Sequence, residues 1–484
     1  VQCPRTEGYE VSAEVSIGGE RVTRTRSFNV ADSPDRLPEV TRFFGGFQAR
    51  CDLVLRHPDG SEETLFECAE SPDDDACSAM DPAVSFDGRQ IAFAVFRGRA
   101  RRSVQNVDAT FFDPAAASES IPVTWPNTHL GARGAHLLVY DLESRTTREV
   151  TTYQAGIWDS GPAWLSTGRL AFTSTRNNVY QTLTHGESGR ASQLHTVDPD
   201  GENIEVASHH GLAAEQHPYQ LRDGRVAYSA WQVFGMLSFR KNNGSIRAAG
   251  STDNLFHLYV QSPDGAEPFA LYGQHTGSGP QMSHNAAHFL TQSGDGWVWT
   301  GEYYRANNNG LANILGFEPP PEGQEGYGYH ELEGLSVPYW ERARSLYHPR
   351  NSMIVAPWSS PGNDLPAPAA EPPFMHPNYA DPIRRVGKIG FPAAVPEGLL
   401  LTWGLGACHI RSLARDAIPS ASGGTDNPSC DVGIYRATSL PVGSPQDLER
   451  VVDRREFHEF MVRPVIPYRA LFGVEQPDII ERAE

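Results

Sequence analysis

The chain has 484 residues, of which 40 are basic and 59 acidic, so its formal net charge is −19. This charge repels phosphate backbones and no basic stripe with interleaved aromatic residues offsets it, so the sequence excludes a nucleic-acid-binding protein. No run of about 18 apolar residues occurs, so we expect no transmembrane segment. The 45 glycines and 37 prolines are typical of a chain with many turns and favour an all-β fold.

The amino-terminal residue and the cysteines point to an exported protein. The chain begins at Val1 rather than at a methionine, so we expect that a signal peptide has been removed and that the protein is periplasmic or extracellular. The six cysteines are even in number, and proximity predicts three disulfides: Cys68 with Cys77, Cys408 with Cys430, and Cys3 with Cys51. Fifteen connectivities are open to six cysteines, and free thiols in a cytosolic protein are the alternative.

One type of segment recurs along the chain. It has a proline, an apolar residue, a glycine turn and a β-rich run, as in "DPAVSFDGRQIAFA" at 81–94. Proline fixes φ, the glycine accommodates a positive φ in the turn, and the apolar residues alternate as in a strand. Further copies are at 161–174, 217–232, 279–291 and 391–403, with another expected at 347–358.

A second type of segment follows these copies. "LHTVDPDGENIEVAS" at 194–208 is two strand-like runs around a Pro-Asp-Gly turn, which predicts a hairpin. Similar hairpins are expected at 53–67, 137–151 and 258–272. Two hairpins give a four-stranded sheet, and four strands recurring every 40 to 60 residues or so indicate β-propeller blades.

The repeat predicts a single six-bladed β-propeller over residues 1–462, with seven blades as the alternative. We expect strands near 10–67 to close the ring against the last strands of the chain. Residues 97–135 and 318–345 interrupt the repeat and are expected to be long inserted loops, which often serve binding. Residues 463–484 are expected to form an extended tail that lies on the ring or on a partner.

The segment from "GPAWLSTGRLAFTSTR" to "HPYQLRDGRVAYSAWQ" resembles the six-bladed propeller domain in the middle of hydrazine synthase alpha subunits. "DPAVSFDGRQIAFA" is similar to the "PxxSPDGxxIxF" motif of the wider TolB-like propellers. Relatives with redox chemistry attach haem through C-x-x-C-H, whereas here "LGACHI" places Leu405 three residues before Cys408 and His409. We therefore expect no covalent haem and no certain cofactor. The resemblance implies a scaffold whose protein partner is a cytochrome.

Two groups of residues could hold metal ions. His217, His348 and His376 each precede a proline, similar to the histidines that bind a divalent metal at the axis of oligogalacturonate-type lyases. A metal needs three or four such ligands, and hydrogen bonding of each histidine to a neighbouring blade is the alternative. Asp73, Asp74 and Asp75 could hold calcium, although the spacing of a calcium loop is missing and a solvated acidic turn is the alternative.

Two functions follow from these features. The first is an exported binding or scaffold protein, a subunit or partner of a cytochrome-type redox complex. The second is a metal-dependent lyase or hydrolase with an axial histidine site. No G-x-S-x-G nucleophile motif occurs, which favours the first function and leaves enzymatic activity undecided.

Overall fold

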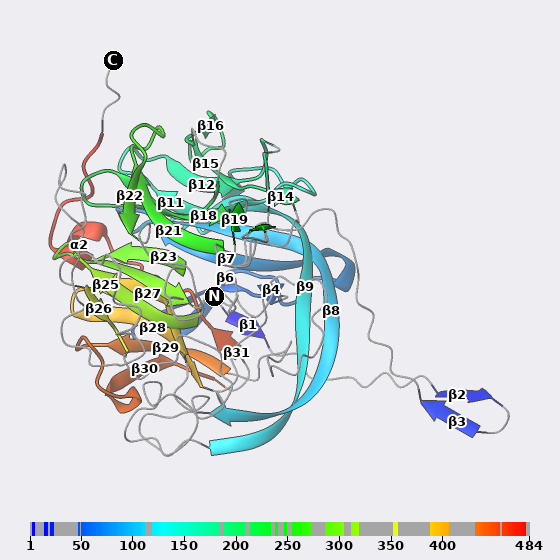
Figure 1. Cartoon of the computed structure of the whole chain (residues 1–484). Helices are drawn as coiled ribbons and strands as arrows, with labels where there is room; N and C mark the ends of the chain where they lie inside the picture. Colours follow the sequence, from blue (N-terminus) through cyan, green and yellow to red (C-terminus); the bar gives the residue numbers. More distant parts are fainter. Residues whose placement is uncertain are drawn as a thin grey trace.

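The computed structural model is an all-β ring of blades. It describes residues 2–4, 14–17, 20–23, 47–48, 50–111, 119–177, 179–182, 188–208, 213–233, 238–240, 246–248, 254–272, 286–303, 311–318, 352–356, 388–405, 431–454 and 457–480. Within these residues five four-stranded antiparallel blades follow one another around an axis (Figure 1). No helix among them is long and apolar enough to cross a membrane.

The five complete blades each run outward from an inner strand. Blade 1 contains β7 (Ala76–Val84), β8 (Gln90–Phe111), β9 (Glu119–Asp141) and β10 (Thr146–Glu149). Blade 2 contains β11 (Asp159–Trp164), β12 (Leu170–Ser174), β15 (Gln193–Val197) and β16 (Glu205–Val206). Blade 3 contains β17 (Ala213–Gln220), β18 (Val226–Val233), β21 (Asn254–Gln261) and β22 (Phe269–Tyr272).

Blades 4 and 5 repeat the pattern. Blade 4 contains β23 (Ala286–Gln292), β24 (Val298–Tyr303), β25 (Leu311–Phe317) and β26 (Ser352–Ile354). Blade 5 contains β27 (Lys388–Val395), β28 (Gly398–Leu405), β29 (Asp431–Ala437) and β30 (Leu448–Val452). Short bridges from β21 to β23 and from β25 to β27 join blades 3, 4 and 5.

Strands from both ends of the chain lie at the sixth position, between blades 5 and 1. β31 (Phe457–Glu459) pairs with β1 (Gln2–Pro4), and β5 (Leu53–Arg56) pairs with β6 (Glu62–Phe66). Strands from both ends of the chain therefore meet at this position, and of the expected 10–67 region the described residues place the hairpin of β5 and β6 there. The hairpin of β2 (Glu14–Ile17) and β3 (Glu20–Thr23) stands away from the ring (Figure 1).

The predicted repeats were located with mixed success. The hairpins at 53–67, 137–151, 194–208 and 258–272 are all present. The copy at 347–358 is wrong, because β26 is the outer strand of blade 4 rather than an inner strand. The copy at 279–291 is displaced, because β23 begins only at Ala286.

The described parts of the interruption at 97–135, residues 97–111 and 119–135, are strand rather than loop. β8 and β9 pair along their whole length, from Gln90 opposite Asp141 to Phe111 opposite Glu119, with one shift in register between Arg97 and Gly98. They leave blade 1 as a long, curved, two-stranded arm (Figure 1). Residues 319–345 of the second interruption lie outside the described residues.

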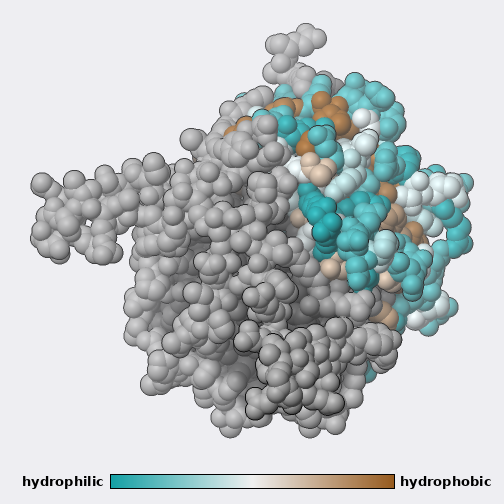
Figure 2. Space-filling model, turned by 90° about the vertical axis from the view of Figure 1, so that its right-hand side faces the viewer, coloured by the Kyte–Doolittle hydropathy of each residue, from teal (hydrophilic) through white to brown (hydrophobic). Residues whose placement is uncertain are grey.

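The core lies between the blades and around the axis. Successive side chains of a strand point to opposite faces of the blade. Ala92 and Ala94 of β8 therefore pack in one core cluster, and Ile91 and Phe93 pack in another. Hydrophilic residues cover most of the described part of the face in Figure 2. Among the described residues only six large apolar side chains are exposed: Ile204, Val206, Phe269, Val451, Ile466 and Ile479.

Candidate functional site at the propeller axis

A bulge recurs at the same place in every inner strand. The pairing with the second strand shifts between Met80/Ala83, Ser160/Ala163, Gln216/Tyr219, His288/Thr291 and Gly390/Ala393. The residue that follows the first of each pair has a φ between 50° and 58°: Asp81, Gly161, His217, Phe289 and Phe391. Met461, after β31, has a φ of 56°. Residues other than glycine rarely adopt this left-handed backbone conformation. A bulge turns the side chain of its residue in a new direction, here toward the axis, so each of these blades contributes one axial residue.

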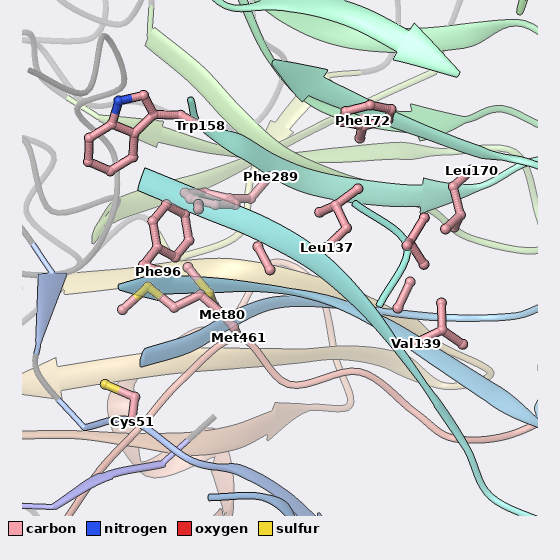
Figure 3. Packing of buried hydrophobic residues seen from close by; sticks show 14 of the residues in the cluster. Cys51, Met80, Phe96, Leu137, Val139, Trp158, Leu170, Phe172, Phe289 and Met461 are labelled. Atoms are coloured by element: carbon pink, nitrogen blue, oxygen red, sulfur yellow. The ribbon is translucent and has the colours of Figure 1, made fainter. Parts of the chain in front are cut away.

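These six residues form one layer around the axis, which we call the axial tier. Apolar side chains fill much of it. Phe289, Phe391 and Met461 are 5%, 0% and 2% exposed, and all three belong to one core cluster. The rings of Phe289 and Phe391 lie 4.5 Å apart between centroids, and the ring of Phe391 lies 5.9 Å from that of Phe460. Figure 3 shows Phe289 and Met461 with Met80 and Phe96 of blade 1 and Trp158, which precedes β11, and all five belong to one core cluster. At this level the axis is a packed core.

His217 is one of the axial residues. Its ring lies 4.0 Å from that of Phe289, and its Nδ1 lies 3.2 Å from Nδ1 of His288, so one imidazole donates a hydrogen bond to the other. Among the other five axial residues, only Asp81 has a side-chain oxygen or nitrogen that could bind a metal ion. The part of the chain that the structure describes contains no group of three metal-binding side chains. His348 and His376 lie outside that part.

A cavity of about 140 Å³, with a mainly apolar lining, lies beside the axial tier. Asp81, Trp164, Tyr219, Arg463 and Tyr468 are among the residues that line it. Oδ2 of Asp81 accepts a hydrogen bond of 3.0 Å from the backbone N–H of Gly161, which ties blade 1 to blade 2. Nε1 of Trp164 donates a second inter-blade hydrogen bond of 3.1 Å to the carbonyl of Ala83.

The charges in this cavity are partly compensated. Burial lowers the pKa of Arg463, and the neighbouring Tyr219 and Asp81 oppose that shift. Burial also raises the pKa of Tyr219, so its hydroxyl stays protonated at neutral pH. Arginine remains charged in proteins, so the Arg463 guanidinium is a cation in a poorly solvated place with Asp81 near it. The cavity combines one carboxylate, one guanidinium and aromatic walls.

The carboxy-terminal segment covers this end of the axis. The backbone N–H of Tyr468 donates to the carbonyl of Phe86 at 2.8 Å, and that of Asp478 to Arg222 at 3.1 Å. Ser166 donates its hydroxyl to the carbonyl of Asp478 at 3.1 Å. Between these contacts lies α2 (Tyr468–Phe472), which approaches the turn of blade 4 so closely that a Cβ on Gly294 would lie 2.6 Å from the Phe472 carbonyl oxygen. The segment thus crosses the turns of four blades.

The acidic turn at 73–75 is paired with arginines. It forms a short 3-10 helix in which Asp73 forms an ion pair with Arg50. Asp74 lies 3.5 Å from Arg99, and Asp75 lies 3.8 Å from Arg97. Each carboxylate therefore has a cationic neighbour, and calcium binding here stays a prediction.

The cysteines partly follow their predicted pairing. A disulfide joins Cys68 to Cys77 and fastens the end of β6 to β7 of blade 1. Cys51 is also disulfide-bonded, and its partner is not among the residues whose side chains the structure describes. Cys408, Cys430 and the side chain of Cys3 lie outside those residues as well.

Sequence reasoning missed three of the cavity residues: Asp81, Tyr219 and Arg463. A signal for the first was present, because the residue before the repeat proline is the axial residue at Pro82, Pro162, Pro218 and Pro392. Aligning the repeats on this residue would have identified Asp81 beside His217. Arg463 could not be found in this way, since it enters from the carboxy-terminal segment.

Five four-stranded sheets around a packed axis, with a sixth position built from both chain ends, define a β-propeller. Among solved structures, the chain is similar to hydrazine synthase from Kuenenia stuttgartiensis, with 14% identity and a TM-score of 0.49 over 89% of this chain and 44% of that one. It is also similar to oligogalacturonate lyase in complex with manganese, with 12% identity and a TM-score of 0.31 over 60% and 65% of the two chains.

A putative TolB from Agrobacterium tumefaciens is similar at 12% identity and a TM-score of 0.21, over 47% of this chain and 89% of that one. No protein-family model and no curated protein matches the sequence. The chain spans less than half the length of the hydrazine synthase chain. These similarities are distant and concern the fold, which diverse enzymes and binding proteins share.

Proposed function

We propose that this protein is an exported binding scaffold, a subunit or partner of a periplasmic or cell-surface redox complex of the cytochrome type. The observation that carries the proposal is the state of the axis, where enzymes and small-ligand binders of this architecture would hold a substrate. Phe289, Phe391 and Met461 fill much of the axial tier, and the chain's own carboxy-terminal segment covers one end. The remaining cavity of about 140 Å³ is smaller than the roughly 300 Å³ at which small-molecule sites begin.

The disulfide supports the exported location. Cys68 and Cys77 form a closed bridge, and such bridges persist in oxidising compartments.

The arm of blade 1 supports binding away from the axis. Its two strands have 22 and 23 residues, whereas the inner strand beside them has nine. An extension of this length is a surface on which a partner can dock. We therefore assign partner contact to the periphery of the ring.

The proposal is tested by purification of the protein from the periplasm together with its partners. We expect a haem protein, detected by its Soret absorbance, to co-purify in a fixed ratio. A matched variant shortens the arm by joining Ala100 to Leu130, which face each other in the hairpin, through an Asn-Gly turn. This variant should fold and lose the haem protein.

Elemental analysis of the same preparations tests the alternative enzyme. Stoichiometric manganese, zinc, copper or iron that disappears in His217→Ala would contradict the scaffold and favour the metal-dependent lyase or hydrolase. Haem protein that is retained by the shortened variant would contradict the role of the arm.

A further inference from the structure

The carboxy-terminal segment brings an arginine to the axis. Nη1 of Arg463 donates to the carbonyl of Pro392, in β27 of blade 5, at 3.2 Å, and to that of Val462 at 2.8 Å. The charge of this guanidinium also interacts with Tyr219 of blade 3 and with Asp81, the axial residue of blade 1. Groups from blades 1, 3 and 5 therefore surround Arg463.

The protein binds only part of this guanidinium. Both hydrogen bonds of the Arg463 side chain to described residues come from Nη1, so Nε and Nη2 have no acceptor among those residues. A guanidinium has several N–H donors in one plane, and two neighbouring donors can hold a carboxylate through parallel hydrogen bonds. A donor that stays unpaired away from water is unfavourable. Arg463 thus presents an edge that fits a carboxylate group.

The unbound edge belongs to a cavity that also contains an anion. Arg463, Tyr219 and Asp81 all line the cavity of about 140 Å³ beside the axial tier, which we call the axial cavity. The charges of Asp81 and Arg463 interact, but the two described side chains form no ion pair with each other. Oδ2 of Asp81 accepts a hydrogen bond of 3.0 Å from Gly161, and a carboxylate can accept several more. The wall therefore has a cation and an anion that are not in contact.

The volume and the lining of the axial cavity limit the size of an occupant. An apolar cavity of about 150 Å³ can bind benzene, so about six non-hydrogen atoms fit here. The rest of the wall is mainly apolar and includes Trp164, Tyr468 and Leu471. Ile466 lines the cavity and is 43% exposed, so the cavity lies close to solvent at the edge of the carboxy-terminal segment.

We propose that the axial cavity binds a small zwitterionic amino acid, with its carboxylate on Arg463 and its ammonium group toward Asp81. A ligand with one charge of each sign keeps this poorly solvated site neutral, whereas an ion of one sign would leave a charge uncompensated. The apolar walls and the small volume favour an amino acid with a short apolar side chain or none. This site is separate from the periphery of the ring, to which we assign partner contact, and it does not depend on that assignment.

The probes are L-alanine and two molecules that each lack one of its charged groups. Propionate lacks the ammonium group of alanine, and ethylamine lacks its carboxylate. In calorimetric titrations of residues 1–484 we expect saturable binding of one alanine per chain. Propionate and ethylamine should each bind about tenfold or more weakly than alanine, because each leaves one charge of the site unmatched. L-phenylalanine, which has the same charges and a larger side chain, should not bind.

Variants of the two charged residues test their roles. Arg463→Met and Asp81→Asn should each weaken alanine binding about tenfold or more. Arg463→Lys keeps the charge without the planar pair of donors, so it should also weaken binding, and it tests the site if Arg463→Met does not fold. Arg469→Met is the matched control in the same segment, since that side chain is 77% exposed and pairs with Glu475 at the surface. This control should bind alanine as the unchanged protein does.

The position of the ligand is tested by fluorescence. Trp164 lines the axial cavity, so alanine should change the tryptophan emission. Trp164→Phe should remove this change, and Trp297→Phe, which alters a tryptophan outside the cavity lining, should keep it.

Four outcomes would overturn the proposal. They are no saturable binding of alanine, equal binding of propionate or ethylamine, unchanged affinity in the folded Arg463 and Asp81 variants, and an emission change that persists in Trp164→Phe. All four are independent of haem-protein co-purification, so failure of the amino acid site and failure of the proposed function are measured separately.

Discussion

One residue in each inner strand decides what lies on the axis of this propeller. The bulge gives that residue a left-handed backbone conformation, which costs about 1 kcal/mol or more for a residue with a side chain. Five of the six positions nevertheless hold side chains, because packing and hydrogen bonding at the axis offset that strain. The type of residue at each axial position therefore determines what the blade places on the axis. Phe289 and Phe391 contribute apolar packing, and Asp81 contributes a polar group.

The Asp81 carboxylate should stabilise the cavity through its charge. Asp81→Asn keeps the shape and can still accept the Gly161 hydrogen bond, but it leaves Arg463 without its anionic neighbour. We expect a loss of about 1 kcal/mol or less in the free energy of unfolding, measured by denaturant titration. The double variant with Arg463→Met should recover part of this loss. Additive losses in the double variant would show that the two residues do not interact.

His195 should make stability depend on pH. It is 1% exposed in β15, and burial lowers its pKa to about 4. Between pH 6.5 and 4 the unfolded chain binds a proton at this histidine and the folded chain does not, so stability falls as the pH falls. His195→Gln should remove about 2 kcal/mol of the loss between pH 7 and pH 5. His57→Gln, at a side chain that is 42% exposed, is the control. An unchanged slope in His195→Gln would contradict the assignment.

At the scale of elements, the carboxy-terminal segment is part of the ring. Tyr468 and Leu471 of α2 are buried, and Gly473 ends the helix with a φ of 68°. The helix has five residues, too few to be stable alone, so its packing on the blade turns holds it in place. An element this short gains its structure entirely from tertiary contacts.

Removal of residues 468–484 should expose the axial cavity. The buried side chains of Tyr468 and Leu471 together contribute about 3–6 kcal/mol, and the free energy of unfolding should fall by that amount. Binding of the dye ANS should rise as apolar surface becomes accessible. Ile479→Ala, at a residue that is 56% exposed, should change stability by about 0.5 kcal/mol or less. Equal stability of the truncated and full-length proteins would mean that the segment does not seal the ring.

For the whole molecule, we expect the sixth position, where the ring closes, to be less stable than the five four-stranded blades. Five blades have four strands each, whereas the sixth position is assembled from both ends of the chain and contains a cavity of about 630 Å³. The disulfide from β6 to β7 and the Arg454 bridge between Glu62 and Glu459 hold its outer hairpin. One disulfide and two ion pairs thus hold this hairpin in the ring.

Arg454→Met should weaken this closure. Glu459 is 2% exposed and would lose its cationic partner, so we expect a loss of about 2 kcal/mol in the free energy of unfolding. Hydrogen exchange should rise in β5 and β6 before it rises in blades 2 to 4. Arg436→Met, which removes an exposed ion pair of 3.5 Å with Glu397, should have an effect of about 0.5 kcal/mol or less. Equal effects of the two variants would show that the bridge does not close the ring.

Local patterns were enough to predict the blades. A glycine turn between alternating apolar residues specifies a hairpin wherever it occurs, so 81–94, 161–174 and 217–232 identified inner and second strands correctly. The same reasoning failed at 347–358, where β26 is an outer strand, and it placed the copy at 279–291 out of register with β23. Blade 4 has Leu290 where the other copies have proline, so its axial Phe289 carried no local signal.

The sequence by itself therefore determined an all-β propeller, its hairpins, its acidic surface and the Cys68–Cys77 bridge, since each depends on residues that lie close together in the chain. Only the tertiary structure decided what fills the axis, where the carboxy-terminal segment lies and which blade position is built from both chain ends. Asp81 and Arg463 line one cavity, and β1 pairs with β31, although each pair is far apart in the chain. Such contacts are set by how the blades pack around the axis, which no local pattern of residues encodes.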